Sequence, residues 1–125
     1  MNASCAKPSV PPRSWIHRIE DILDAIARIQ THTAGLDFER FKRDAKTADA
    51  VNYLLLVIGE AAAHLPPDVS RNYPEIPWAE IRDMRNVMAH GYFVISQEIV
   101  WQTIANDLPP LVEKLRRVLD ATDKG

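Results

Sequence analysis

Residues 51–65, VNYLLLVIGEAAAHL, form an almost continuous apolar run that decides the fold of this chain. On a helix, the apolar side chains of this run cover nearly the whole circumference, so the helix must lie at the centre of a bundle or between subunits. We expect it to begin near Thr47 and to end at Leu65, because Pro66 and Pro67 cannot continue it. The run is too short to cross a bilayer. It therefore predicts a helical bundle built around this segment.

Upstream of this run, the sequence predicts two further helices. Ser14 is the expected N-cap of an amphipathic helix that ends at Thr31–Ala34, with Gly35 as its stop. A short helix follows at Leu36–Arg43, with Asp37 as its cap. Residues 1–13 show little apolar periodicity and are expected to form a flexible extension.

Downstream of the run, a loop and two helices are predicted. Asp68–Ile76 is expected to be a turn-rich loop, and Pro77 suits the first turn of a helix that lasts until Gly91. Ser96 opens the last helix, in which Pro109 and Pro110 predict a kink or a break.

The expected fold class is therefore all-α, an up-and-down bundle of four main helices plus a short one. Only Tyr92–Ile95 has a strand-like pattern, and it is too short and isolated to form a sheet. The predicted organisation is an extension at residues 1–13, a helical domain at residues 14–121 and a tail at residues 122–125.

Composition limits the function that this domain can have. With 15 Lys and Arg against 17 Asp and Glu, the formal charge is −2, which excludes the global basic field of a high-affinity nucleic-acid binder. An anionic substrate would need a local basic cluster. A single cysteine, Cys5, allows no disulfide within the chain, and no long apolar core marks a secretory signal. We expect a cytoplasmic protein without contact to a membrane.

Chemistry concentrates in residues 85–92, RNVMAHGY, at the end of a predicted helix. The guanidinium of Arg85 can bind a phosphate through two parallel hydrogen bonds, and a histidine such as His90 can transfer protons near neutral pH. On a helical projection, Arg85 falls within the packed arc, while Arg82, Asn86 and His90 form a polar stripe on the flank. Structural explanations remain open: Arg85 could pair with a carboxylate or reach solvent at the bundle edge, and His90 could cap the helix.

A second polar stripe lies on the central helix, where Tyr53, Glu60 and His64 follow at i, i+7 and i+11. Glu60 could orient Arg85 or His90, or it could be a partly exposed glutamate without a role at the site. No glycine-rich phosphate loop is present, and His17 and His32 lack a matching carboxylate pair. We expect neither a metal nor a cofactor.

Residues 85–92 resemble the Arg-x4-His-x-Tyr signature of the HEPN superfamily, and specifically of HepT-like toxins. The likeness extends over roughly residues 13–121. It includes Ile58-Gly59-Glu60-Ala61, Ile76-Pro77-Trp78, Val100-Trp101 and Asp107-Leu108-Pro109. The joint occurrence of these segments is more specific than the octapeptide alone.

The resemblance implies a homodimer whose paired motifs line an interface cleft, and a metal-independent endo- or exoribonuclease that acts on mRNA or tRNA. It implies the toxin role in a HEPN/MNT (HepT/MntA, type VII-like) toxin–antitoxin module. Arg85 and His90 would be catalytic, with Asn86, Glu60 and Arg82 in support. A nucleotidyltransferase antitoxin would silence the toxin by transferring AMP to Tyr92. The alternative is an inactive HEPN module that binds nucleotide or a nucleotidyltransferase partner.

Overall fold

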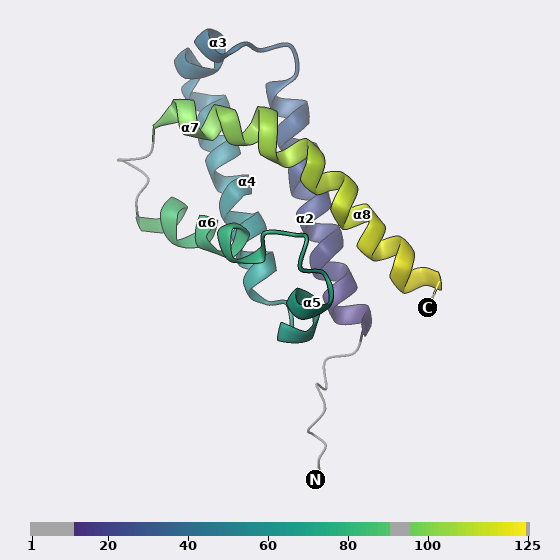
Figure 1. Cartoon of the computed structure of the whole chain (residues 1–125). Helices are drawn as coiled ribbons and strands as arrows, with labels where there is room; N and C mark the ends of the chain where they lie inside the picture. The colour runs from purple at the N-terminus through teal and green to yellow at the C-terminus, as the bar shows by residue number, and fades with distance from the viewer. Residues whose placement is uncertain (1–11, 91–95, 125) are drawn as a thin grey trace.

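The computed structural model describes residues 12–90 and 96–124, and within them every regular element is a helix (Figure 1). The main helices are α2 (Pro12–Thr33), α4 (Ala45–Ala63), α6 (Trp78–His90) and α8 (Leu108–Lys124). Shorter elements are α3 (Phe38–Arg43), α5 (Pro67–Asn72), α7 (Gln97–Gln102) and the π-helical turn η2 (Thr103–Asp107). The predicted all-α class is confirmed, and the predicted strand-like stretch Tyr92–Ile95 lies outside the described residues.

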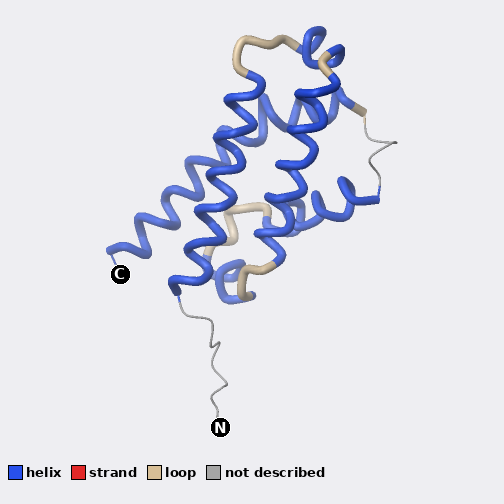
Figure 2. Tube along the Cα trace, turned by 180° about the vertical axis from the view of Figure 1, so that it is seen from behind, coloured by secondary structure: helices blue, strands red, loops and turns tan. Residues whose placement is uncertain are grey.

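Helix α4 is the centre of the bundle, as its apolar sequence predicts. It packs against α2 on one side and α6 on the other, and Figure 2 shows α2 and α4 running side by side. Val51, Leu54, Leu55 and Ile58 are fully buried within it. The helix begins two residues before the predicted Thr47, because Asp44 accepts a hydrogen bond from the Thr47 amide and acts as N-cap.

The helices before α4 end and start largely where local chemistry predicts. Helix α2 ends at Thr33, and Gly35 has a φ of 80°, the left-handed conformation that stops helices. The Asp37 side chain accepts the Arg40 amide and caps α3. The expected start of α2 was wrong, because Ser14 lies inside a helix that already begins at Pro12. Proline at the first position of a helix loses no hydrogen bond, which explains the earlier start.

The predicted loop at Asp68–Ile76 is largely helical, which corrects the sequence prediction. Helix α5 covers Pro67–Asn72, with Pro67 in its first turn and Val69 buried beneath it. Pro66 and Pro67 thus end α4 and at the same time start the next helix. Within the described residues the bundle therefore has three short α-helices, α3, α5 and α7, beside its main ones.

The break expected near Pro109 and Pro110 occurs one turn earlier along the chain. The amide of Leu108 bonds to the Thr103 carbonyl, five residues back, and the helix widens into the π turn η2 before α8 begins. Both prolines then occupy the first turn of α8, where their lack of an N–H group is tolerated. The predicted cap Ser96 is confirmed, since its hydroxyl accepts the Glu98 amide at 3.1 Å.

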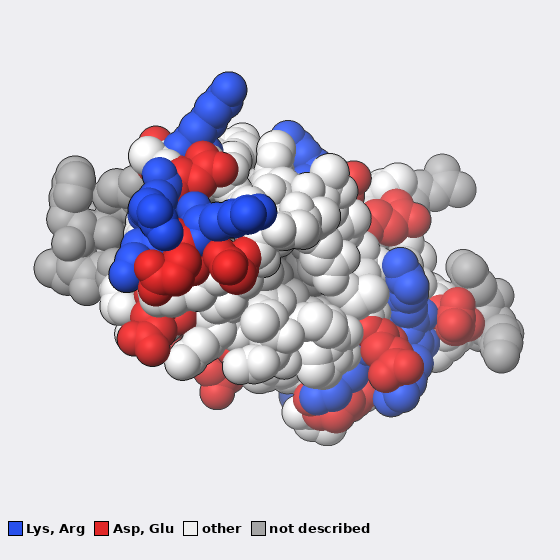
Figure 3. All heavy atoms as spheres, turned by 90° about the horizontal axis from the view of Figure 1, so that it is seen from above, with Lys and Arg blue, Asp and Glu red and all other residues white. Residues whose placement is uncertain are grey.

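Aromatic contacts close the end of the bundle at α3 and α7. The fully buried ring of Phe41 lies 5.1 Å from that of Trp101, centroid to centroid. Seen from this end, mixed groups of positive and negative side chains lie on opposite sides of an uncharged centre (Figure 3). This mixture agrees with the near-neutral composition. No helix among residues 12–90 and 96–124 is long and apolar enough to cross a membrane.

Candidate active site

The helix that carries the motif, α6, is anchored at its first turn. Trp78 is buried, and its indole Nε1–H donates a 2.9 Å hydrogen bond to the Tyr73 carbonyl. Ile81, one turn later, is also buried. These contacts satisfy a buried polar group and fix the start of the helix.

Gly59 allows the middle of α6 to lie directly on α4. A Cβ added at Gly59 would be 2.6 Å from the amide nitrogen of Arg85 and 3.1 Å from its Cα. A methyl group cannot occupy that space, so the close approach of the two backbones requires glycine. The motif arginine is thereby placed against the residue that follows this glycine, Glu60.

Arg85 and Glu60 form an ion pair at the edge of the bundle. Nη1 of Arg85 lies 3.5 Å from Oε1 of Glu60, and the two side chains are 42% and 51% exposed. The backbone of Arg85 faces α4, as the projection into the packed arc predicts, while its guanidinium pairs with a carboxylate and reaches solvent, as the structural alternatives for Arg85 allow. Glu60 is partly exposed and also contacts the motif arginine.

Two further arginines, Arg82 and Arg71, are not gathered around this pair. Nη1 of Arg82 lies 3.5 Å from the Ser70 hydroxyl oxygen on α5, and Arg71 pairs with Asp68 within the same helix. Asn86 is exposed on the flank of α6, one turn beyond Arg82. Arg82 and Asn86 therefore share the predicted polar flank, but Arg82 is directed toward α5.

Two motif residues, His90 and Tyr92, lie at or beyond the limit of the described residues. His90 is the last residue of α6, and its side chain lies outside the described part of the structure. Tyr92 also lies outside the described residues. Their catalytic and regulatory roles therefore stay predictions.

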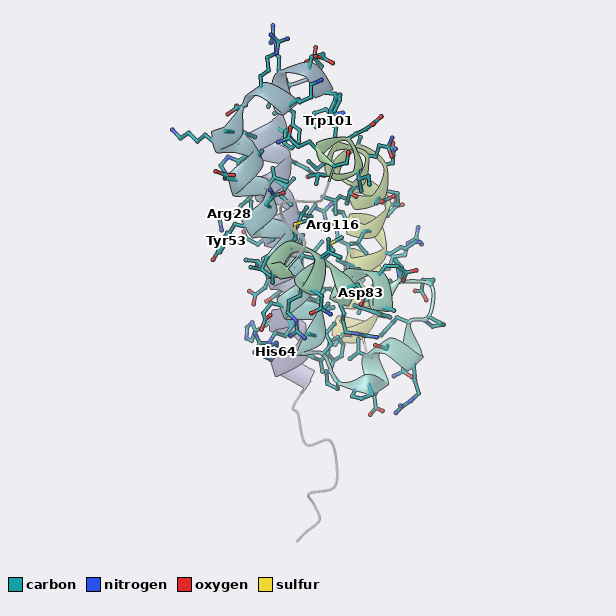
Figure 4. All side chains as sticks on the ribbon, turned by 90° about the vertical axis from the view of Figure 1, so that its left-hand side faces the viewer. Arg28, Tyr53, His64, Asp83, Trp101 and Arg116 are labelled. Carbon is teal, nitrogen blue, oxygen red and sulfur yellow. The ribbon has the colours of Figure 1, made fainter. Side chains whose placement is uncertain are left out.

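The predicted stripe on α4 is present on the surface of the bundle. Tyr53 is 60% exposed, and Glu60 and His64 are exposed as well. Figure 4 shows Tyr53 and His64 on the same side of the molecule. His64 is the C-cap residue of α4, with its Nδ1 2.8 Å from the Glu60 carbonyl oxygen. This bond is consistent with a structural role for His64 at the helix end.

Sequence reasoning missed a hollow of about 400 Å³ between α2 and α4, which we call the α2–α4 hollow. Its deeper wall consists of Ala25, Leu56, Val57 and Ala61. Glu60 also lines it, so the hollow borders the Arg85–Glu60 pair. Helical periodicity shows which face of a helix is polar but not how far two helices stand apart, so it carried no signal for this space.

No group of three or more His, Cys, Asp or Glu that could hold a metal ion occurs in the part of the chain that the structure describes. What this part of the site offers chemically is one half-exposed guanidinium held by a carboxylate, together with hydrogen-bonding groups on the flank of α6. Such a site suits an anion like a phosphodiester.

Comparison with known proteins identifies the family. A family model described as ribonuclease HepT-like matches residues 22–118. A Thermococcus cleftensis protein named "Probable ribonuclease HepT" is 42% identical over 108 residues, which cover 84% of this chain and 98% of that protein.

Two further relatives are named as candidate RNases. One, from Methanocaldococcus jannaschii, is 35% identical over 79% of this chain and 82% of its own length. The other, from Caldanaerobacter subterraneus, is 32% identical over 86% of this chain and 94% of its own length. No solved structure matches the chain significantly. The matched region contains Gly59, Glu60 and the whole of α6, and the chain belongs to the HepT-like ribonuclease family of the HEPN superfamily.

Proposed function

We propose that this chain is a metal-independent ribonuclease, the toxin of a HEPN/MNT toxin–antitoxin module that acts on mRNA or tRNA in the cytoplasm. The observation that carries the proposal is the Arg85–Glu60 pair, which holds a guanidinium at the surface of the motif helix instead of burying it. Its support is the family to which the chain belongs and the names of its relatives.

The proposed reaction uses the nucleophile that RNA itself carries. The 2′-hydroxyl oxygen attacks the adjacent phosphorus, and the bond to the 5′ oxygen breaks, which leaves a 2′,3′-cyclic phosphate and a free 5′-hydroxyl. His90, from one or both subunits, takes the proton of the attacking hydroxyl and supplies one to the leaving oxygen. Arg85 neutralises the charge that develops on the phosphoryl oxygens.

A homodimer is part of the proposal, with the contact on the side of α6 that faces α7. Val87 and Ile99 are 43% and 60% exposed there, beside the half-buried Met84 and Met88. Exposed apolar side chains that gather on one face support a protein contact. Burial of this face would bring two copies of the motif helix together. Ile99→Asp should give monomers in sedimentation equilibrium, and a dimer that persists would place the contact elsewhere.

The proposed control acts on Tyr92, two residues after the end of α6. A nucleotidyltransferase antitoxin would transfer AMP from ATP to the tyrosine oxygen and release pyrophosphate. The added phosphate brings bulk and negative charge, which repels RNA. Intact mass of the protein co-expressed with such a partner should rise in whole AMP units. A rise that persists in Tyr92→Phe would assign the modification to another residue.

The decisive test is cleavage of RNA in EDTA by the purified chain. The wild type should cut mRNA or tRNA, and His90→Ala should abolish cutting while the protein stays folded and dimeric. If the wild type cuts no RNA, and the wild type and His90→Ala bind a nucleotidyltransferase equally tightly, the result would instead favour the inactive binding module.

A further inference from the structure

The α2–α4 hollow adjoins the Arg85–Glu60 pair through Glu60 and has features of a ligand site. Its volume of about 400 Å³ falls within the range of roughly 300–1,000 Å³ typical of small-molecule pockets. Glu60 connects the two places, because it lines the hollow and also contacts Arg85. If an RNA strand binds to Arg85 through one phosphate, a neighbouring nucleotide of that strand would therefore lie beside the hollow.

Tyr53 gives the hollow an aromatic surface. It is 60% exposed although it sits on the most apolar helix of the bundle, and it lines the hollow together with the aliphatic Leu56 and Val57. An exposed aromatic ring beside an apolar wall is a surface on which an unpaired base can stack. A base can stack on this ring only when it is outside a duplex, so the ligand would be a single-stranded nucleic acid.

Two arginines line the hollow beside three carboxylates, those of Asp21, Asp24 and Glu60. Arg18 and Arg28 of α2 line it, and neither pairs with a carboxylate among the residues the structure describes. Arg28 and Tyr53 line the same hollow, and Figure 4 shows both on the same side of the molecule. A guanidinium in this position can bind the phosphate of a nucleotide whose base lies on the tyrosine.

Two carboxylates narrow the choice of base. Asp21 and Asp24 also line the hollow and likewise have no cationic partner among the described residues. Carboxylates accept hydrogen bonds from the amino groups of adenine, cytosine or guanine, whereas the pairing edge of uracil offers only its N3–H as a donor. The first three bases therefore offer the carboxylates an amino donor that uracil lacks.

We propose that the α2–α4 hollow binds one unpaired, amino-bearing nucleotide of single-stranded RNA next to the scissile phosphate. Tyr53 stacks on its base, Arg28 binds its phosphate, and Asp21 or Asp24 accepts from its amino group. The proposal rests on the ribonuclease function proposed above and specifies the form of RNA that the site takes.

The experiment measures binding separately from cleavage. Fluorescently labelled 2′-O-methyl RNA of nine adenosines, which lacks the 2′-hydroxyl nucleophile, is titrated with the full chain and followed by anisotropy. Tyr53→Ala should raise Kd about five- to one-hundred-fold, the range of one lost base stack. Tyr53→Phe retains the ring and should stay within about twofold. Nine uridines should bind more weakly than nine adenosines.

Arg28→Gln tests the phosphate contact. It should weaken binding and flatten the slope of log Kd against log salt by about 0.7, the value for one phosphate of a single strand. The matched control is Arg116→Gln, an exposed arginine of α8 that lies away from the hollow (Figure 4). The control should leave the slope unchanged.

The outcomes separate this proposal from the ribonuclease function. If Tyr53→Ala and Arg28→Gln bind like the wild type while His90→Ala alone stops cleavage, the hollow is not an RNA site and the ribonuclease stands. A wild type that binds but does not cut, with Tyr53→Ala weaker than Tyr53→Phe, supports the hollow and overturns the ribonuclease. A change of oligomeric state in either hollow variant would make this face a subunit contact and overturn the proposal.

Discussion

On one side of α4, the backbone of α6 lies so near Gly59 that an added Cβ would be 2.6 Å from the Arg85 amide nitrogen, whereas on the other side α2 leaves a hollow of about 400 Å³. Both neighbours pack extensively against the same helix, and both contacts are largely apolar. The difference lies in the residue that α4 presents: a glycine toward α6, and larger side chains such as Leu56 and Val57 toward α2. Backbone contact fixes a functional side chain in place, while side-chain contact leaves space for a ligand.

This contrast assigns different tasks to the two sides of one helix. Glu60 is the residue that they share, because it follows Gly59 and lines the α2–α4 hollow. The close side therefore sets the position of Arg85, and the open side is where a substrate can extend beyond it. Changing one side at a time should separate stability, catalysis and RNA binding.

The largest effect is expected from Gly59→Ala, which forces the two backbones apart. The new methyl group would clash with backbone atoms of Arg85, and overpacking of this kind costs about 1–3 kcal/mol. The higher helix propensity of alanine offsets only about 1 kcal/mol of that. Urea unfolding should show a net loss of stability, and RNA cleavage should fall further than the folded fraction does, because Arg85 moves.

Gly35→Ala is the matched control for this variant. Nothing lies within 4 Å of a Cβ at Gly35, and its cost comes only from the positive φ of 80°. It should lose stability without losing cleavage per folded molecule. Equal losses of cleavage per folded molecule in the two variants would show that Gly59 does not position the motif.

On the open side, Val57→Phe should fill space that is already there. Val57 is half-buried and lines the α2–α4 hollow, and valine and phenylalanine have similar helix propensities. We expect urea unfolding to shift by less than about 1 kcal/mol, since no packed neighbour is displaced. Anisotropy with single-stranded RNA should show weaker binding. A loss of stability as large as that of Gly59→Ala would mean that the two sides of α4 do not differ.

At the residue shared by both sides, Glu60→Gln should affect activity more than stability. An exposed ion pair contributes only about 0.2–1 kcal/mol, so the melting temperature should hardly change. The cleavage rate should fall because the guanidinium of Arg85 loses its orienting charge. Glu113→Gln, which breaks the more exposed pair with Arg117 on α8, is the control and should leave cleavage intact. Equal cleavage by the two variants would show that Arg85 needs no carboxylate.

The contrast between local and long-range features also explains what the sequence could predict. Gly35, Asp37 and Ser96 act within a few residues of themselves, and their helix-end roles were predicted correctly. Pro67 was interpreted only as a stop, although proline also suits a first turn, so α5 was missed.

Contacts between distant residues were harder to predict. The Arg85–Glu60 contact joins residues 25 positions apart, and spacing alone could propose it but not decide it. The exposure of Arg85 was left open because a helical projection follows Cβ and not the end of a long, flexible side chain. The α2–α4 hollow depends on the distance between two helices, which no periodicity encodes.

The smallest effect is expected at the start of α4, where Asp44 caps the helix. Hydrogen bonds from the Thr47 hydroxyl and from the Thr47 amide lower the pKa of the Asp44 carboxyl. A lowered pKa in the folded state means that the stabilisation is present above the ordinary pKa of the group and is lost as the pH falls through the lowered value. The asparagine side chain of the variant Asp44→Asn can still cap the helix but does not titrate. The wild type should therefore melt slightly higher than Asp44→Asn at neutral pH, and the difference should shrink in acid. A difference that stays constant in thermal melts across that range would assign the cap to hydrogen-bond geometry alone, without a contribution from charge.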